Sequence, residues 1–308
     1  MVTGFVTVGT QVLIMFILIA AGYSCGKLKI FNDDGVKCMN DLVFYFVTPC
    51  VIITSYQRRF DATLLRNLLL SIVSAILTHI VGIAIGLIVF KNFEETKKVL
   101  YRFGAVYSNS GFMALPLVDA LLGSEGVFYA AGYIAVLNTI MWSYGQYTMS
   151  KAKGEYDMKK IIINPGVIPV AVGLILFFAS ISLPEIVLSP MNFLSGLNTP
   201  IPMMIIGYTM SKADLKTTFK LGTGYLAIAI RLVAVPLVML AILYTLHYRG
   251  TLLVACMVSA SAPIAASTTM FAIKFGKDEE TASKLVSAST LLSIITITLI
   301  IGFTQAIA

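Results

Sequence analysis

Two stretches of the chain combine proline with small polar residues in a pattern that could bind an anion. They are residues 107–116, YSNSGFMALP, and residues 258–269, VSASAPIAASTT. Proline removes a backbone donor and clashes with the preceding helical turn, so the sequence predicts helix breaks near Pro116 and Pro263. Gly111 lowers the cost of unwinding the first helix further.

A broken helix presents unpaired N–H groups at the start of its second half, where the helix dipole places about half a positive charge. Two such starts facing one cavity would hold an anion without a basic side chain. Asn109, Ser110 and Ser261 would add oriented donors. The alternative is that both prolines only kink structural helices. The pairing of the two breaks favours the anion site.

The composition places these stretches in a membrane. Of the 308 residues, 58% are hydrophobic and only 12% are charged, and the formal net charge is +7. A charged share about half that of an ordinary soluble domain leaves too few charges for a water-facing surface. The composition therefore excludes a soluble enzyme, a nucleic-acid-binding domain, a disulfide scaffold and a disordered chain.

The cysteines and the N-terminus carry no further signal. Cys25, Cys38, Cys50 and Cys256 form no CxxC pair and have no histidine cluster near them. They are interpreted as small apolar residues, with no metal site and no disulfide. The N-terminal segment lacks a basic start and a cleavage motif, so we expect a retained first span rather than a signal peptide.

Runs without Asp, Glu, Lys or Arg define the expected membrane spans, because a helix needs about 20 apolar residues to cross the hydrocarbon. None of the runs alternates as a barrel strand would, so we expect an all-α membrane protein with ten transmembrane helices. The runs are 1–26, 42–57, 67–90, 103–118, 126–150, 161–184, 186–211, 232–248, 250–273 and 285–308. Odd-numbered loops carry seventeen Lys and Arg residues and even-numbered loops four, so both termini are expected outside the cytoplasm.

The two halves of the chain resemble each other weakly. Thr48-Pro49 and Thr199-Pro200 stand 151 residues apart, and both Tyr101-Arg102 and Pro116 recur 147 residues later, at Tyr248-Arg249 and Pro263. Each half then holds five spans, so the second half starts from the opposite face of the membrane. This pattern predicts an inverted repeat, with residues 1–149 and 164–308 as the repeats and 150–163 as a cytoplasmic linker.

The second, fourth and eighth spans need extension past one charged residue each, Asp41, Asp119 and Arg231. Three ionisable residues inside the spans so extended are candidates for coupling or charge balance, because such residues are costly in a membrane. Asp119 could pair with Arg231, bind a cation or carry a proton, or it could lie at the outer interface. Arg231 could balance the substrate or bind backbone carbonyls of an unwound segment. His79 could carry a proton, although a neutral histidine bonded between helices is favoured.

Several motifs, taken in order along nearly the whole chain, resemble the auxin efflux carrier family, which includes the plant PIN proteins and bacterial carboxylate permeases. The stretch Asn109–Leu117 resembles the family's Asn-x-x-x-Met-Gly-x-Pro-Leu crossover, and LNTIMW at 137–142 resembles its Leu-Gln-x-x-x-Trp motif. The other matches are RLVAVP from Arg231, Arg249-Gly250, Pro263, and SASTLLS at 287–293.

The resemblance implies a scaffold of spans 1, 2, 6 and 7 and a transport domain of spans 3–5 and 8–10. It also implies an elevator motion, pairing as a homodimer through the scaffold, and organic anions as substrates, either indole-3-acetate or malate and malonate. Asn109 matches the asparagine that contacts the carboxylate, and Asn138 stands where the family often has glutamine. Asp119 and Ile264 depart from the plant pattern, which favours a carrier of small carboxylates in a bacterial inner membrane.

The expected function is therefore secondary transport of a small organic anion by alternating access, in contact with membrane lipid and without nucleic acid or catalysis. The alternatives are a sodium-coupled symporter of the bile-acid type and a non-transporting anion sensor. No nucleotide-binding motif is present, so Na⁺ or H⁺ is the candidate coupling ion, with Ser267 and Thr268 as hydroxyls that would suit Na⁺. The candidate substrate-binding residues are Asn109, Ser110, Gly111, Asn138, Ser261, Ala262 and Ile264.

Overall fold

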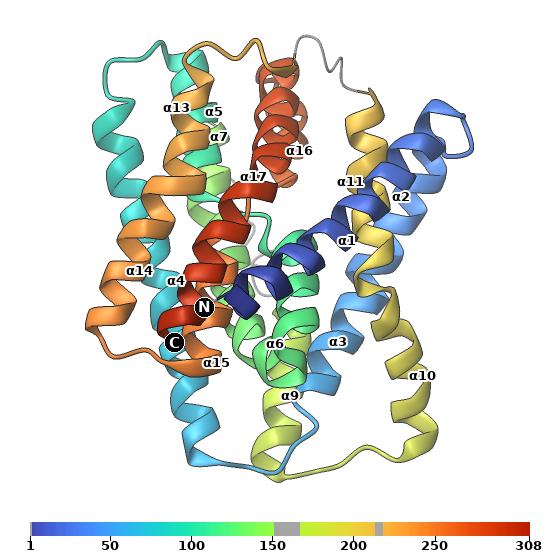
Figure 1. Cartoon of the computed structure of the whole chain (residues 1–308). Coiled ribbons are helices and arrows are strands. Elements are labelled where there is room, and N and C mark those ends of the chain that lie inside the picture. Colours follow the sequence, from blue (N-terminus) through green and yellow to red (C-terminus); the bar gives the residue numbers. More distant parts are fainter. Residues whose placement is uncertain (1, 151–166, 213–217) are drawn as a thin grey trace.

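The computed structural model describes residues 2–150, 167–212 and 218–308, and within these ranges helices joined by turns and loops make up the fold, with one isolated β-bridge (Figure 1). The expected linker 150–163 lies outside the described residues except for Ser150. The helices of the first half are α1 (Val2–Lys27), α2 (Asp33–Leu42), η1 (Val43–Val47), α3 (Thr48–Ser55), α4 (Ala62–Val89), α5 (Glu95–Val106), η2 (Ser110–Ala114), α6 (Leu115–Ile140), η3 (Met141–Gly145) and α7 (Gln146–Ser150). Those of the second half are α9 (Ile168–Ala179), α10 (Glu185–Ser195), η4 (Gly196–Asn198), α11 (Pro200–Lys212), α13 (Gly224–Ala229), η5 (Ile230–Ala234), α14 (Val235–Thr245), α15 (Gly250–Ser261), α16 (Ser267–Lys274) and α17 (Glu279–Ile307).

Six helical segments in the described residues are long and apolar enough to cross a membrane. They are Phe5–Lys27, Asp33–Ser55, Ala62–Val89, Ser110–Ser150, Gly224–Thr245 and Glu279–Ile307. Two shorter apolar helices, α9 and α15, accompany them. The expectation of an all-α membrane protein is thereby confirmed for the described part of the chain, whereas the ten-helix inverted repeat stays a prediction.

The segment Ser110–Ser150 is too long for one crossing. At 1.5 Å per residue, its 41 residues would extend about 60 Å, roughly twice the hydrocarbon thickness. Gly123 interrupts it with φ 61° and ψ −156°, a backbone conformation that glycine adopts without steric cost. Gly123 therefore divides this segment into a shorter and a longer helical part.

Three prolines inside helical segments each follow a π-helical turn by two residues. Pro49 follows η1, Pro116 follows η2 and Pro236 follows η5. A proline ring clashes with the carbonyl four residues earlier, and a turn widened by one residue moves that carbonyl aside. The wide turns keep their hydrogen bonds, as in the bond from Leu115 N to Ser110 O five residues earlier. These prolines therefore widen their helices without breaking them.

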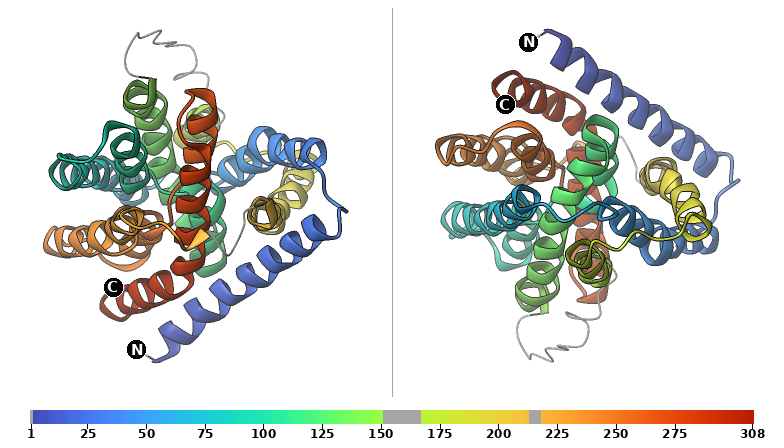
Figure 2. Two further views of the ribbon diagram at one scale, coloured as in Figure 1. Left: turned by 90° about the horizontal axis from the view of Figure 1, so that it is seen from above. Right: turned by 90° about the horizontal axis from the view of Figure 1, so that it is seen from below.

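The helices gather into two sets that pack side by side (Figures 1 and 2). In one set α1 packs on α11, and α3 packs on α9 and α10. Gly22 of α1 faces the backbone of Met204, and Gly207 of α11 faces the backbone of Ile19, so these two helices touch without intervening side chains. The other set is built around α6, which packs against α4 and α15, with α17 against α15. Whether these sets act as scaffold and transport domain stays a prediction.

Candidate functional site

Two interrupted helices meet in the middle of the set of helices built around α6. Helix α5 ends at Val106 and the chain resumes helical form at η2, while α15 ends at Ser261 and resumes at α16. The residues between them pair as a short antiparallel bridge centred on Ser108 and Ile264. Asn109 N donates to Pro263 O at 2.8 Å, and Ala265 N donates to Tyr107 O at 3.0 Å. The unwound backbone groups thus satisfy one another in the protein interior, as a membrane requires.

The positions of the interruptions differ in one respect from the expectation. Pro263 lies within its unwound segment, as predicted. Pro116 does not, since the first helix opens at 107–109 and Pro116 already stands at the start of α6. The reason is the widened turn η2, which accommodates the proline ring and lets the helix continue through it.

Hydrogen bonds from neighbouring side chains hold the two unwound segments together. Ser110 Oγ donates to Ser259 O at 3.0 Å, and its hydroxyl lies 2.6 Å from that of Ser108. Ile264 N donates to Ser289 Oγ of α17 at 3.2 Å. The sequence predicted Ser110 as a donor for the ligand, but its proton is used here within the crossing. Ser108, Ser259 and Ser289 were missed, and their only signal was the frequency of serine around the prolines.

Arg231 binds the carbonyl ends of α5 and α15, the two helices that precede the interruptions. Its side chain is fully buried in η5, and its Nη1 donates to Val106 O at 3.1 Å while Nη2 donates to Ala260 O. Of the two roles that the sequence left open, this geometry matches the binding of backbone carbonyls. No ion pair joins Arg231 to Asp119 among the described residues, and Asp119 is half-buried further along α6.

Three buried polar side chains at the crossing have an atom without a hydrogen-bond partner. These atoms are Asn109 Nδ2, Ser261 Oγ and Thr268 Oγ1. Asn109 is 6% exposed, and Ser261 and Thr268 are 0% exposed. A buried polar group without a partner costs about 1–3 kcal/mol, so these three atoms are available to a ligand or to water at the crossing.

The backbone around these side chains provides further donors and some room. Both η2 and α16 begin at the crossing, where the first N–H groups of a helix lack an acceptor within it. At α16 the N–H groups of Thr268 and Thr269 already donate to Ala265 O and Ala266 O, so the start of η2 is the main source of free backbone donors. A methyl group built on Gly111, in the first turn of η2, would meet nothing within 4 Å. An anion placed beside Gly111 would therefore meet donor groups and the positive end of a helix dipole.

The remaining candidates lie around this crossing with different surroundings. Ser267, the first residue of α16, donates to Met141 Sδ at 3.1 Å. Asn138 is half-buried one turn before Met141 on the same face of the α6–η3 helix. Ala262 and Ile264 are buried in the unwound segment, where they supply shape and no polar side-chain atom.

His79 of α4 is buried between two tyrosines. Its Nδ1 lies 2.7 Å from Ala75 O, so Nδ1 carries the hydrogen and Nε2, which has no partner, is an acceptor. Its ring lies 5.9 Å from that of Tyr107 and 6.3 Å from that of Tyr133. This geometry fits a neutral histidine, but the hydrogen bond of His79 stays within α4 and does not join two helices as the sequence favoured.

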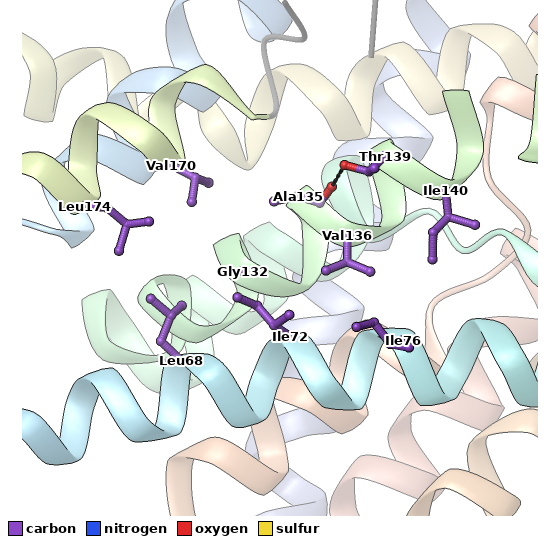
Figure 3. A pocket seen from close by; sticks show the side chains of 10 residues that line it. All are labelled: Leu68, Ile72, Ile76, Gly132, Ala135, Val136, Thr139, Ile140, Val170 and Leu174. Carbon is purple, nitrogen blue, oxygen red and sulfur yellow. Dashed lines mark hydrogen bonds between the residues drawn. The ribbon is translucent and has the colours of Figure 1, made fainter. Parts of the chain in front are cut away.

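An apolar cavity of about 360 Å³ lies between α4, α6 and α9 (Figure 3). Thr139 is the only lining residue with a polar side chain, and its hydroxyl donates to Ala135 O. The cavity thus offers nothing to hold an anion, and the crossing stays the candidate site.

Comparison with known proteins gives the class of this helical membrane protein. A family described as membrane transport protein matches residues 7–159 and 150–301. The chain belongs to this family, the auxin efflux carrier-like family that its motifs resemble.

Three relatives match over nearly their whole length. An uncharacterized transporter of Methanothermobacter thermautotrophicus is 27% identical over 94% of this chain and 95% of its own. One of Methanocaldococcus jannaschii is 24% identical over 94% and 96%. A Rhizobium meliloti protein named "Putative malonate transporter" is 23% identical over 93% and 92%. Since the family and these relatives are transporters by name, the chain is a membrane transporter and not an enzyme.

Proposed function

We propose that this protein is a secondary transporter of small carboxylate anions and binds the carboxylate at the crossing of the two interrupted helices. The observation that carries the proposal is the set of unpartnered buried atoms on Asn109, Ser261 and Thr268 beside two helix starts. A carboxylate has two oxygens and about four acceptor positions, so it can satisfy several of these donors at once. Charge-assisted hydrogen bonds of this kind are about twice as strong as neutral ones.

The transport step that we propose is an elevator motion. Helices α4–α7 and α13–α17 form the moving transport domain, and α1–α3 and α9–α11 form the scaffold, each drawn from two inverted five-span repeats. The contacts within each set of helices support this division, although α1 of the scaffold also packs against α17 of the transport domain. We further propose that two copies pair through the scaffold, that both termini lie outside the cytoplasm, and that the protein resides in a cell membrane.

The substrate class that we propose is a small carboxylate of the malonate type. The name of the Rhizobium meliloti relative supports it, and the relative matches most of this chain. For the coupling ion we propose Na⁺ held with the help of the unpartnered Thr268 hydroxyl, or H⁺ carried by His79 Nε2. Uptake driven by a Na⁺ gradient alone or by a pH gradient alone distinguishes the two.

The test is uptake of labelled malonate into liposomes that contain the purified full-length protein. Asn109→Ala is expected to reduce both binding and uptake while the protein stays folded, because it removes a donor that has no partner within the protein. Asn192→Ala, on the exposed face of α10, is the matched control and should behave as wild type. Malonate binding without uptake would instead identify a sensor. Unchanged affinity in Asn109→Ala would refute the site.

A further inference from the structure

The interior of the protein contains very little side-chain charge. In the described residues, Arg231 is the only charged side chain that is buried. Asp119 is half-buried and lies one turn beyond Pro116, on the far side of η2 from the crossing. The charge available to a bound anion therefore comes from Arg231 and from the ends of helices.

The positive charge of Arg231 is balanced by the helix ends that it binds. Val106 is the last residue of α5 and Ala260 is the last but one of α15. The carbonyl end of a helix carries about half a negative charge, so two such ends carry about one in total. Since Nη1 and Nη2 of the guanidinium donate to both ends, most of its charge is balanced there, and only its Nε has no partner within the described residues.

The two helices that follow the interruptions contribute positive charge at the crossing. The continuous helix that begins with η2 and the helix α16 each start with about half a positive charge, or about one in total. Asn109, Ser261 and Thr268 add neutral donors only. Dipoles and donors at this place are thus sufficient for one carboxylate.

A second carboxylate on the same ligand would find no buried Lys or Arg side chain besides Arg231 among the described residues. The side chains of Met113, Ile264 and Met141 are apolar and buried, Phe112 is half-buried, and the polar candidates Asn138 and Ser267 are neutral. An ionised group in such surroundings keeps its desolvation penalty without compensation.

We infer that the site takes a single negative charge, so that it selects singly charged carboxylates over dicarboxylate dianions. The inference rests on the proposed function and makes it more specific. A dicarboxylate such as malonate is then bound with one of its two carboxyl groups protonated. The dianion is rejected because its second charge has no counterpart in the crossing.

The test compares two ligands of nearly equal size on the purified full-length protein. Malonate is a dianion near neutral pH, whereas monomethyl malonate carries one charge at any such pH. Titration calorimetry near neutral pH is expected to show about tenfold or more tighter binding of the monomethyl ester.

Lowering the pH provides a second measurement on the same ligands. At pH values above the second pKa of malonate, each unit by which the pH falls raises the singly charged fraction about tenfold. The apparent affinity for malonate should rise in the same proportion. The affinity for the monomethyl ester should stay constant, which shows that the protein itself has not changed. Malonate binding that is equal to or tighter than that of the ester, and independent of pH, would overturn the inference. Binding of neither ligand nor of any other carboxylate would refute the proposed function itself.

Discussion

Gly111 provides a direct test of where the ligand lies. It is in the first turn of η2, and a methyl group there would meet nothing within 4 Å. Gly111→Ala therefore fits the protein, and it should leave stability unchanged or raise it by up to about 1 kcal/mol, because alanine favours a helix over glycine. The same methyl group would occupy the space in which the carboxylate approaches the first N–H groups.

The expected loss of ligand affinity follows from the hydrogen bonds that the added methyl group would prevent. A hydrogen bond to a charged group contributes about 1.5–3 kcal/mol, so the loss of one should weaken binding about tenfold or more. Ligand at 100 times its Kd stabilises the folded state by about 2.7 kcal/mol. After a tenfold rise in Kd the same ligand concentration gives about 1.4 kcal/mol. The expected result is therefore a ligand-induced rise in melting temperature about half that of wild type.

The assay is thermal unfolding of the purified protein with and without malonate. Gly196→Ala is the matched control, since Gly196 in η4 also has open space around it and a negative φ, and it lies in the other set of helices. Gly196→Ala should keep the full ligand-induced shift. If Gly111→Ala also keeps that shift, the ligand does not lie beside η2 and the reasoning about the site is wrong.

Three further predictions concern stability. Arg231→Met leaves the carbonyls of Val106 and Ala260 without their donor, so thermal unfolding should show a loss of about 1–3 kcal/mol for each unsatisfied group, and wild-type stability would contradict the role given to Arg231. Gly207→Ala would place its methyl group 2.6 Å from Tyr23 N, so it should lower stability by about 1–3 kcal/mol, whereas Gly196→Ala should not. Burial alone would raise the pKa of Asp278, but hydrogen bonds from the Thr281 hydroxyl and backbone outweigh it and hold that pKa below its ordinary value. The cap of α17 is therefore fully effective above the unfolded pKa of about 3.9 and is lost as the pH falls below it. Asp278→Asn should remove this pH dependence of the melting temperature, and an identical acid profile in the variant would contradict it.

The sequence predicted the helical membrane class because that class depends on composition and on the lengths of apolar runs. It also placed the two interruptions to within a few residues, since proline and serine together are costly inside a helix. Pro263 lies in its interruption, whereas the first interruption precedes Pro116 by several residues. Proline limits the local backbone, but the pairing of Ser108 with Ile264 decides where the helix opens. That contact joins residues more than 150 positions apart and leaves no local signal.

The role of Arg231 shows a similar limit. An arginine within an apolar run is readily found in a sequence, and its cost predicts that it has partners. Its partners are backbone carbonyls of Val106 and Ala260, which are present at every position of every chain. A sequence alone therefore cannot distinguish this arrangement from an ion pair with Asp119.

The widened turns before Pro49, Pro116 and Pro236 affect how this chain is aligned with its relatives. Each adds one residue to a turn, which rotates the rest of that helix by about 100° compared with an unbroken α-helix. A helical wheel drawn straight through such a proline would assign the wrong residues to the lipid. A relative that lacks one of these prolines is expected to lack one neighbouring residue as well. A single-residue gap at such a place in an alignment then means that the rest of the helix presents the same face in both proteins, and it is not an alignment error.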